Sequence, residues 1–389
     1  MRNIYKTSAL VIATSAILAA QDLTITNARI IGPNETVIER GSIVVRGGKI
    51  ASVQAGVPAA TAGQVIDTKG MSAMPGFIDG HRHINTGPNE KAQMQALLEA
   101  GYTTILSGGG PAEGNITLRD HINNGTINGP RIIPSGAVRL NGTADEARAQ
   151  VRALAAMGIK FTGEILLTPI PGPTDHELEV LRAVVDEGKK AGVMIQVHAV
   201  STKAMVAAAE AGVPLLVHIP NKDWTSKEDA KKIAAAGTKA LGTVAFGSPV
   251  FGVFAEDNKP RFRDGKQWPE GIIDGVRLGE EAGYMPVNAR TLWDANVVLG
   301  YCTDTTYDPL AGLDHELKML NVMFSMKDLI KMMGPNTASY VQMGDQIGTL
   351  QPGKLADIIL LDGNPLEGYW NWLRTKVVVK EGKVVVDKR

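Results

Sequence analysis

The stretch from Met74 to His83, MPGFIDGHRH, decides how this sequence is interpreted. Its apolar residues follow a Pro-Gly pair and are typical of a buried β-strand, which ends in the pattern His-x-His. Side chains alternate between the two faces of a strand, so His81 and His83 lie on one face and both imidazoles can reach one metal ion. An isolated His-x-His also fits two ordinary histidines on a strand face. Its position at the end of this strand favours a metal site.

Short apolar strands alternate with helical patterns through the middle of the chain, which is typical of βαβ units and a parallel sheet. We predict eight strands, at residues 72–79, 103–106, 131–134, 160–166, 193–198, 214–218, 240–246 and 297–302. Eight strands favour an α/β fold, a closed (β/α)₈ TIM barrel. Threonines followed three residues later by glutamate predict helix starts at Thr143, Thr174 and Thr225. Residues 247–286 form an insertion that is expected to cover the barrel mouth.

Four of the seven histidines and one aspartate lie at the C-terminal ends of predicted strands. Active sites of barrel enzymes are built on that face, and histidines with only a packing role have no reason to prefer it. The sequence therefore predicts one site containing all five residues. They are His81, His83, His198, His218 and Asp304. The alternative for Asp304 is an ordinary helix N-cap.

Both ends of the chain are rich in short β-like segments, from residue 23 to 66 and again from 355 to 386. Each end is too small to fold alone, so we expect the two to pair into one small β-sandwich domain. That domain comprises residues 21–74 and 346–389. The barrel domain comprises residues 75–345.

Composition excludes several classes of function. Lys+Arg and Asp+Glu are balanced at 40 each, so no net field favours nucleic acid or an anionic membrane. A small-molecule or dipeptide-like substrate is the expected partner, and a homo-oligomer is left open. The single cysteine, Cys302, excludes a disulfide framework and any multi-cysteine zinc module. A metal must therefore be held by histidines and carboxylates.

The first twenty residues have the pattern of a secretory signal peptide. A basic start is followed by an apolar run from Ala9 to Ala20, which is too short to span a bilayer. We expect a mature chain that begins close to Gln21, is exported to the periplasm and has no membrane span once the signal is removed. A lipid-facing anchor or a disordered leader is the alternative.

The run Pro-Gly-Phe-Ile-Asp-x-His-x-His resembles the first-strand signature of the amidohydrolase superfamily. Similar features extend over nearly the whole chain after residue 20. QVH at 196–198 and LVH at 216–218 each end a strand in histidine, YCTDT at 301–305 ends the eighth with the aspartate, and GTLQPGKLAD at 348–357 looks like the return into the small β domain. The subgroup that it resembles is that of the imidazolonepropionase- and prolidase-like enzymes.

The resemblance implies a metal-dependent hydrolase with two divalent ions and a water activated between them. Nitrogen and oxygen ligands suit zinc best, with manganese, iron or cobalt as alternatives. In this interpretation the four histidines hold the ions. Asp304 contacts one ion, takes a proton from the water and passes it to the leaving amine.

The resemblance also implies a carboxylate from the fourth strand between the two ions, supplied either by a glutamate or by a carbamylated lysine. The sequence offers both, because Glu164 and Lys160 are four residues apart and share a strand face. Glu164 is the preferred bridge because it lies closer to the C-terminal mouth. Lys160 remains the alternative.

The function expected from these features is hydrolysis of a C–N bond in an amide, a cyclic amide or an Xaa-Pro-type substrate. The same two-ion site would also serve an ester, lactone or organophosphate hydrolase. A non-catalytic binding module is the alternative from another class. The complete set of potential ligands argues against it.

Overall fold

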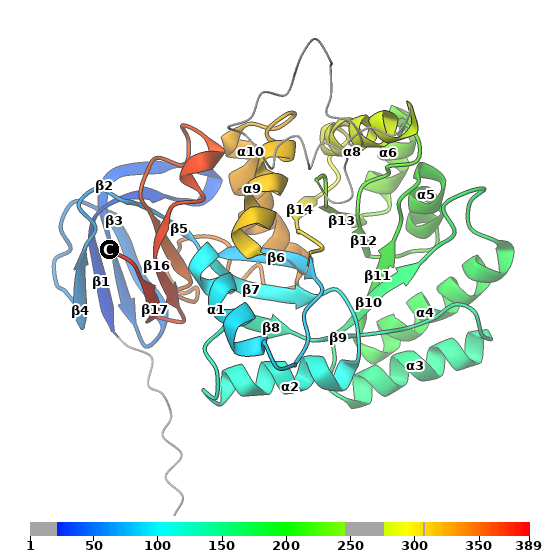
Figure 1. Ribbon diagram of the computed structural model, residues 1–389, viewed down its shortest axis with the longest axis horizontal. Helices are drawn as coiled ribbons and strands as arrows, with labels where there is room; N and C mark the ends of the chain where they lie inside the picture. The colour runs from blue at the N-terminus through cyan, green and yellow to red at the C-terminus, as the bar shows by residue number, and fades with distance from the viewer. Residues whose placement is uncertain (1–21, 246–275, 306–307) are drawn as a thin grey trace, which may run out of the picture.

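A computed structural model of the protein describes residues 22–245, 276–305 and 308–389 (Figure 1). The predicted signal peptide and most of the predicted insertion at 247–286 lie outside the described residues. The last part of that insertion, from residue 276, is the start of a helix. Within these ranges, no helix is both long and apolar enough to cross a membrane.

The two ends of the chain form one eight-stranded sheet, seen on the left of Figure 1. The C-terminal strands join the N-terminal ones through β15 and β5, which pair antiparallel with Ile358 opposite Pro75. The predicted pairing of the two terminal segments is therefore observed, whereas its packing as a sandwich stays a prediction. The strands are β1 (Leu23–Ile31), β2 (Val37–Arg46), β3 (Lys49–Ala55), β4 (Gln64–Asp67), β5 (Ser72–Pro75), β15 (Ile358–Leu361), β16 (Thr375–Lys380) and β17 (Lys383–Asp387).

All eight strands predicted for the middle of the chain are present, with shifted ends, and they pair in parallel. Together with the two-residue β9, which was not predicted, they form a three-stranded sheet, β6-β7-β8, and a six-stranded sheet in the order β14-β13-β12-β11-β10-β9. Pro134 alone separates β8 from β9. The strands are β6 (Phe77–Arg82), β7 (Tyr102–Ser107), β8 (Arg131–Ile133), β9 (Ser135–Gly136), β10 (Phe161–Leu166), β11 (Met194–His198), β12 (Leu215–Val217), β13 (Lys239–Gly242) and β14 (Leu299–Tyr301).

Helices follow most of these strands and pack around them through a large apolar core (Figure 1). They are α1 (Glu90–Ala100), α2 (Ala112–Asn123), α3 (Ala144–Ala156), α4 (Asp175–Ala191), α5 (Thr202–Glu210), α6 (Lys227–Ala235), α8 (Val276–Asp294), α9 (Pro309–Leu320), α10 (Met326–Lys331) and α11 (Thr337–Tyr340). Short 3₁₀ turns occupy Pro33–Glu35 and Tyr369–Asn371, and a π turn occupies Met332–Asn336.

Helix caps test the sequence rules directly. Thr143 and Thr174 each form the predicted capping box, with the side chain accepting from the third backbone amide. The prediction for Thr225 was wrong by one residue, because Ser226 caps α6 by accepting from the Asp229 amide. The Thr225 hydroxyl instead lies 2.9 Å from that of Thr202.

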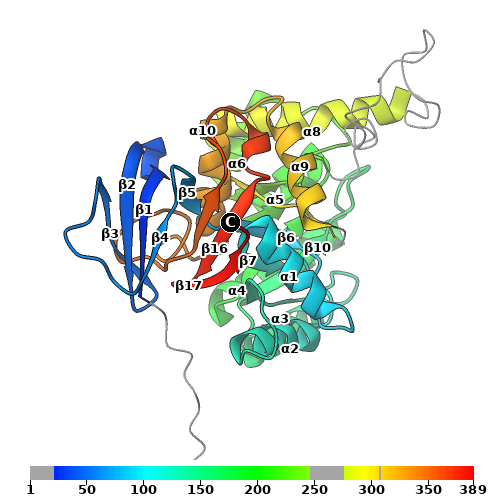
Figure 2. The ribbon, with the colours of Figure 1, turned by 60° about the vertical axis from the view of Figure 1, so that its left-hand side comes forward.

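The terminal sheet and the β/α region are joined at the metal-site strand. Only Gly76 separates β5 from β6, and a Cβ at this position would lie 2.3 Å from the Thr103 side chain, so glycine is required. Just beyond it, the ring of Phe77 stacks on Trp372, with centroids 5.9 Å apart. Figure 2 shows the C-terminal strands β16 and β17 beside β6, β7 and α1.

Candidate metal centre

Glu164 lies at the centre of the predicted site, near the C-terminal end of β10. Its Oε2 lies 2.7 Å from Nδ1 of His198 and 3.0 Å from Nε2 of His218. Its Oε1 lies 3.6 Å from Nε2 of His83 and 3.9 Å from Nε2 of His81. The two carboxylate oxygens therefore face two different pairs of histidines.

Asp304 completes the half of the site that contains His81 and His83. Its Oδ1 lies 3.0 Å from Nε2 of His83 and 3.4 Å from Nε2 of His81. Its backbone amide donates to the carbonyl of His81 at 2.9 Å, which links the residues after β14 to β6. Asp304 and His218 both have positive φ, 51° and 75°, a strained conformation that is concentrated at functional sites.

The donor set fits divalent metal ions. His81 is fully buried, yet neither of its ring nitrogens has a hydrogen-bond partner among the described residues. The buried Oδ1 of Asp304 also lacks one. Unpaired polar atoms in a protein interior are costly, so these atoms call for a partner. Ligand atoms gather within 4.8 Å of one another in two groups that share Glu164. One group adds His81, His83 and Asp304, and the other adds His198 and His218.

Electrostatics favour cations at this site. Burial alone would raise the pKa of Glu164, but hydrogen bonds with His198 and His218 and the nearby ring of His83 outweigh it and hold the pKa below its usual range. Burial opposes ionisation of Asp304 as well, but the adjacent rings of His81 and His83 outweigh it and hold its pKa below the usual range. Both carboxylates raise the pKa of His83 to about 10, Asp304 most strongly. Two ionised carboxylates thus face the same small volume.

Lys160, the alternative bridging residue, lies away from this group. Its side chain is exposed, and it precedes β10 at the end opposite the cluster. Its carbonyl accepts from the Met194 amide at 2.8 Å. Of the two residues that the sequence offered, the structure brings Glu164 to the histidines.

Three residues that support the site were not found from the sequence. Thr243, directly after β13, places its hydroxyl 2.7 Å from Nδ1 of His218. The buried side chain of Glu316 on α9 accepts hydrogen bonds from the backbone amides of Val244 and Ala245, at 2.6 and 2.9 Å. Gly108 leaves room for the His81 ring, since a Cβ there would lie 2.7 Å from Nε2. Gly108 and Thr243 both directly follow a strand in the structure, whereas Glu316 lies within α9 and carries no such signal.

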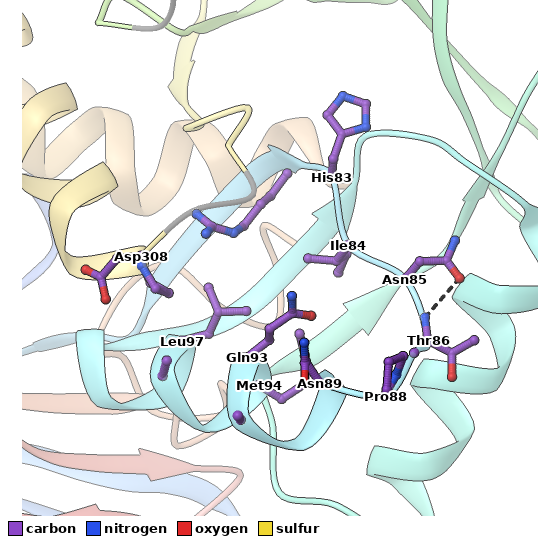
Figure 3. A pocket seen from close by; sticks show the side chains of 15 residues that line it. His83, Ile84, Asn85, Thr86, Pro88, Asn89, Gln93, Met94, Leu97 and Asp308 are labelled. Carbon is purple, nitrogen blue, oxygen red and sulfur yellow. Dashed lines mark hydrogen bonds between the residues drawn. The ribbon is translucent and has the colours of Figure 1, made fainter. Parts of the chain in front are cut away.

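Two cavities flank the site. The larger, of about 540 Å³, lies between residues 82–89, α1 and the start of α9. In Figure 3 the His83 ring projects away from the α1 side chains that line it, such as Gln93 and Leu97. The smaller, of about 250 Å³, lies against His198 and His218.

Comparison with known proteins agrees with this geometry. Residues 72–243 and 285–385 match the model of the amidohydrolase family. The chain belongs to this family. This amidohydrolase is 21% identical over 414 aligned positions to imidazolonepropionase of Caldanaerobacter subterraneus subsp. tengcongensis, covering 90% of this chain and 91% of that one. The expectation of an enzyme of the amidohydrolase superfamily is thus confirmed.

Solved structures share the fold of this amidohydrolase. A prolidase complexed with N-methylphosphonate-L-proline has a TM-score of 0.77 at 21% identity, covering 94% of this chain and 100% of that chain. Phenylurea hydrolase B has a TM-score of 0.75 at 22% identity, covering 94% and 97%.

Proposed function

We propose that this amidohydrolase cleaves a C–N bond, in an amide, a cyclic amide or an Xaa-Pro-type substrate, with the help of two divalent ions. The observation that carries the proposal is the position of Glu164, whose two oxygens face two separate groups of ligands. The relatives add support, because imidazolonepropionase and the prolidase are named for substrates of this kind.

We assign the metal ligands from the same geometry. His81, His83 and Asp304 would hold one ion, His198 and His218 the other, and Glu164 would bridge them. Imidazole and carboxylate ligands suit zinc first, with manganese, iron or cobalt as alternatives.

Asp304 is the proposed proton carrier. When bound, a pair of divalent ions lowers the pKa of a shared water and polarises a substrate carbonyl. Asp304 is a carboxylate at neutral pH, so it can accept a proton at Oδ1 or Oδ2. Asp304 then returns this proton to the departing nitrogen, which leaves as a neutral amine.

We also propose that the eight parallel strands close into a (β/α)₈ barrel of residues 75–345, with residues 21–74 and 346–389 as the β-sandwich domain. Two observations support closure. Only Pro134 interrupts the path from β8 to β9, and the hydrogen bond from Asp304 to His81 joins the last strand end to the first.

The test combines metal analysis with a substrate panel. Purified protein should contain close to two equivalents of metal and hydrolyse at least one amide, cyclic amide or Xaa-Pro dipeptide, and a chelator should abolish the activity. Turnover restricted to esters, lactones or phosphotriesters would replace the C–N assignment. Metal-replete protein without any hydrolytic activity would favour a binding module.

A further inference from the structure

The smaller cavity opens on the His198 and His218 half of the metal centre, away from Asp304. Apolar side chains provide much of its wall, and polar groups lie near the two histidines. Ile219 and Met285 are buried, and Val200 is half-buried. The lining residues are His198, Val200, His218, Ile219, Asn221, Lys222, Thr243 and Met285.

Asn221 carries the one unusual polar atom of this lining. Its side-chain oxygen is buried and has no hydrogen-bond partner within the described parts of the chain. An unpaired buried acceptor costs free energy comparable to a lost hydrogen bond. Asn221 also lines the cavity, so a ligand there could supply the donor that the described parts of the chain do not.

The backbone around Asn221 is fixed. Asn288 on α8 donates from Nδ2 to the carbonyls of Pro220 and Asp223, at 2.9 and 2.8 Å. The amide of Asn221 donates to the carbonyl of Val200 at 2.9 Å. The backbone that carries Asn221 is therefore held on both sides, so a poorly held loop does not explain the missing partner.

We propose that this cavity is the acyl-side subsite of the enzyme, and that it selects small aliphatic acyl groups bearing one neutral hydrogen-bond donor, a hydroxyl or an amide N–H, directed to Asn221. This inference rests on the proposed function. We place the acyl group in this cavity because Asp304, which returns its proton to the leaving nitrogen, lies in the other half of the centre. The acyl group then extends toward His198 and His218.

Size and charge narrow the ligand further. A volume of about 250 Å³ is below the range of roughly 300–1,000 Å³ that is typical of sites for drug-sized ligands, so the acyl group has only a few heavy atoms. Lys222 also lines the cavity, and its positive charge disfavours an ammonium group as the donor. The larger cavity lies instead beside His83, in the half of the centre that contains Asp304.

The test uses two p-nitroanilides with the same leaving group, one of 2-hydroxypropanoic acid and one of 2-methylpropanoic acid, which exchange a hydroxyl for a methyl group. The matching proline amides form a second pair. For the metal-loaded wild type we expect kcat/KM to favour the hydroxy compound by about ten- to a hundredfold, because a site built around a hydrogen bond rejects the analogue that lacks it.

Asn221→Leu, with Asn221→Ala as a second variant in case the first fails to fold, should bring this ratio close to one. Asn128→Leu, at an exposed asparagine far along the chain, is the control and should keep the wild-type ratio. A wild-type ratio near one, or a ratio unchanged in both Asn221 variants, would overturn the inference.

Failure of the proposed function gives a different result. If the metal-loaded enzyme cleaves neither pair, calorimetry with the two free acids decides the inference on its own. Tighter binding of 2-hydroxypropanoate in the wild type, lost in Asn221→Leu, would still support the subsite. Equal binding of the two acids would refute it.

Discussion

The hydroxyl of Thr243 lies 2.7 Å from Nδ1 of His218, on the side of the imidazole opposite Glu164. Burial lowers the pKa of His218, which favours the neutral ring. With an ion bound, a neutral ring that donates from Nδ1 to Thr243 would present the lone pair of Nε2 to that ion. Thr243 thus sets which nitrogen of His218 is available for metal.

Removing this hydroxyl should weaken metal binding. We expect Thr243→Val to lower metal affinity by about 10- to 100-fold, in the range for groups that orient a ligating histidine. Thr243→Ser retains the hydroxyl and should stay within a few-fold of the wild type. Titration against a competing chromophoric chelator measures both affinities, and equal affinities in the two variants would contradict this role.

Glu164 and Lys160 should differ sharply in their effect on metal content. Glu164→Ala removes the carboxylate that both ligand groups share, so at least one ion should be lost. Lys160→Ala alters an exposed side chain and should leave occupancy intact. Elemental analysis of both variants decides the matter. Bicarbonate-dependent reconstitution, or metal loss confined to Lys160→Ala, would instead support carbamylated Lys160 as the bridging residue.

Asp304→Asn should separate chemistry from metal binding. The amide keeps an oxygen for the ion but cannot carry a proton, so turnover should fall by about 100-fold or more while most of the metal is retained. Activity and metal content are measured on the same preparation. His81→Ala is the comparison, because it should lose metal as well as activity. Full activity in Asp304→Asn would remove its assigned role.

Glu316 should make the stability of the protein depend on pH. Burial is the main reason that its pKa is raised, from 4.5 to about 8, and the charge of Asp79 adds to the effect. The unfolded chain ionises this group from about pH 4.5, whereas the folded protein resists ionisation until about pH 8. Its contribution to stability is therefore fully present below pH 4.5 and is lost as pH rises to 8, by roughly 2–5 kcal/mol.

Glu316→Gln should remove that part of the pH dependence. Glutamine also replaces one acceptor by a donor opposite Val244 or Ala245, so the slopes of stability against pH, rather than absolute values, are compared. Denaturant unfolding at several pH values gives these slopes. Parallel slopes for variant and wild type would contradict the assignment.

We propose export of the protein on the basis of its first twenty residues. A mature chain beginning close to Gln21 should be recovered from the periplasmic fraction, which N-terminal sequencing of that fraction tests. Abundant soluble cytoplasmic protein that retains Met1 would contradict it.

The strand-end rule found most of the site because it rests on local pattern. His198, His218 and Asp304 each follow an apolar run, and parallel strands bring their C-terminal ends to one face. Thr243 directly follows β13 in the structure but was missed, since the predicted strand continued to residue 246 and a hydroxyl alone carries no metal signature. Glu316 could not be found at all, because its partners are backbone amides 71 and 72 residues away in the chain.

Local rules are weakest where two candidates lie close together in the sequence. Thr225 and Ser226 both fit the position that begins α6, and tertiary contacts decided between them, as the Thr225 hydroxyl faces Thr202. Glu164 and Lys160 were expected to share a strand face, but β10 begins at Phe161, which leaves Lys160 outside the strand and Glu164 near its C-terminal end beside the histidines.

Only one residue, Gly76, connects β5 of the terminal sheet to β6, which carries His81 and ends just before His83. With Gly76 confined by Thr103 and Phe77 stacked on Trp372, movement of one region displaces the other. The two regions should therefore melt in one cooperative transition. Deleting β15, β16 and β17 should therefore displace the strand that carries His81, because the truncated chain loses both Trp372, which stacks on Phe77, and β15, which pairs with β5.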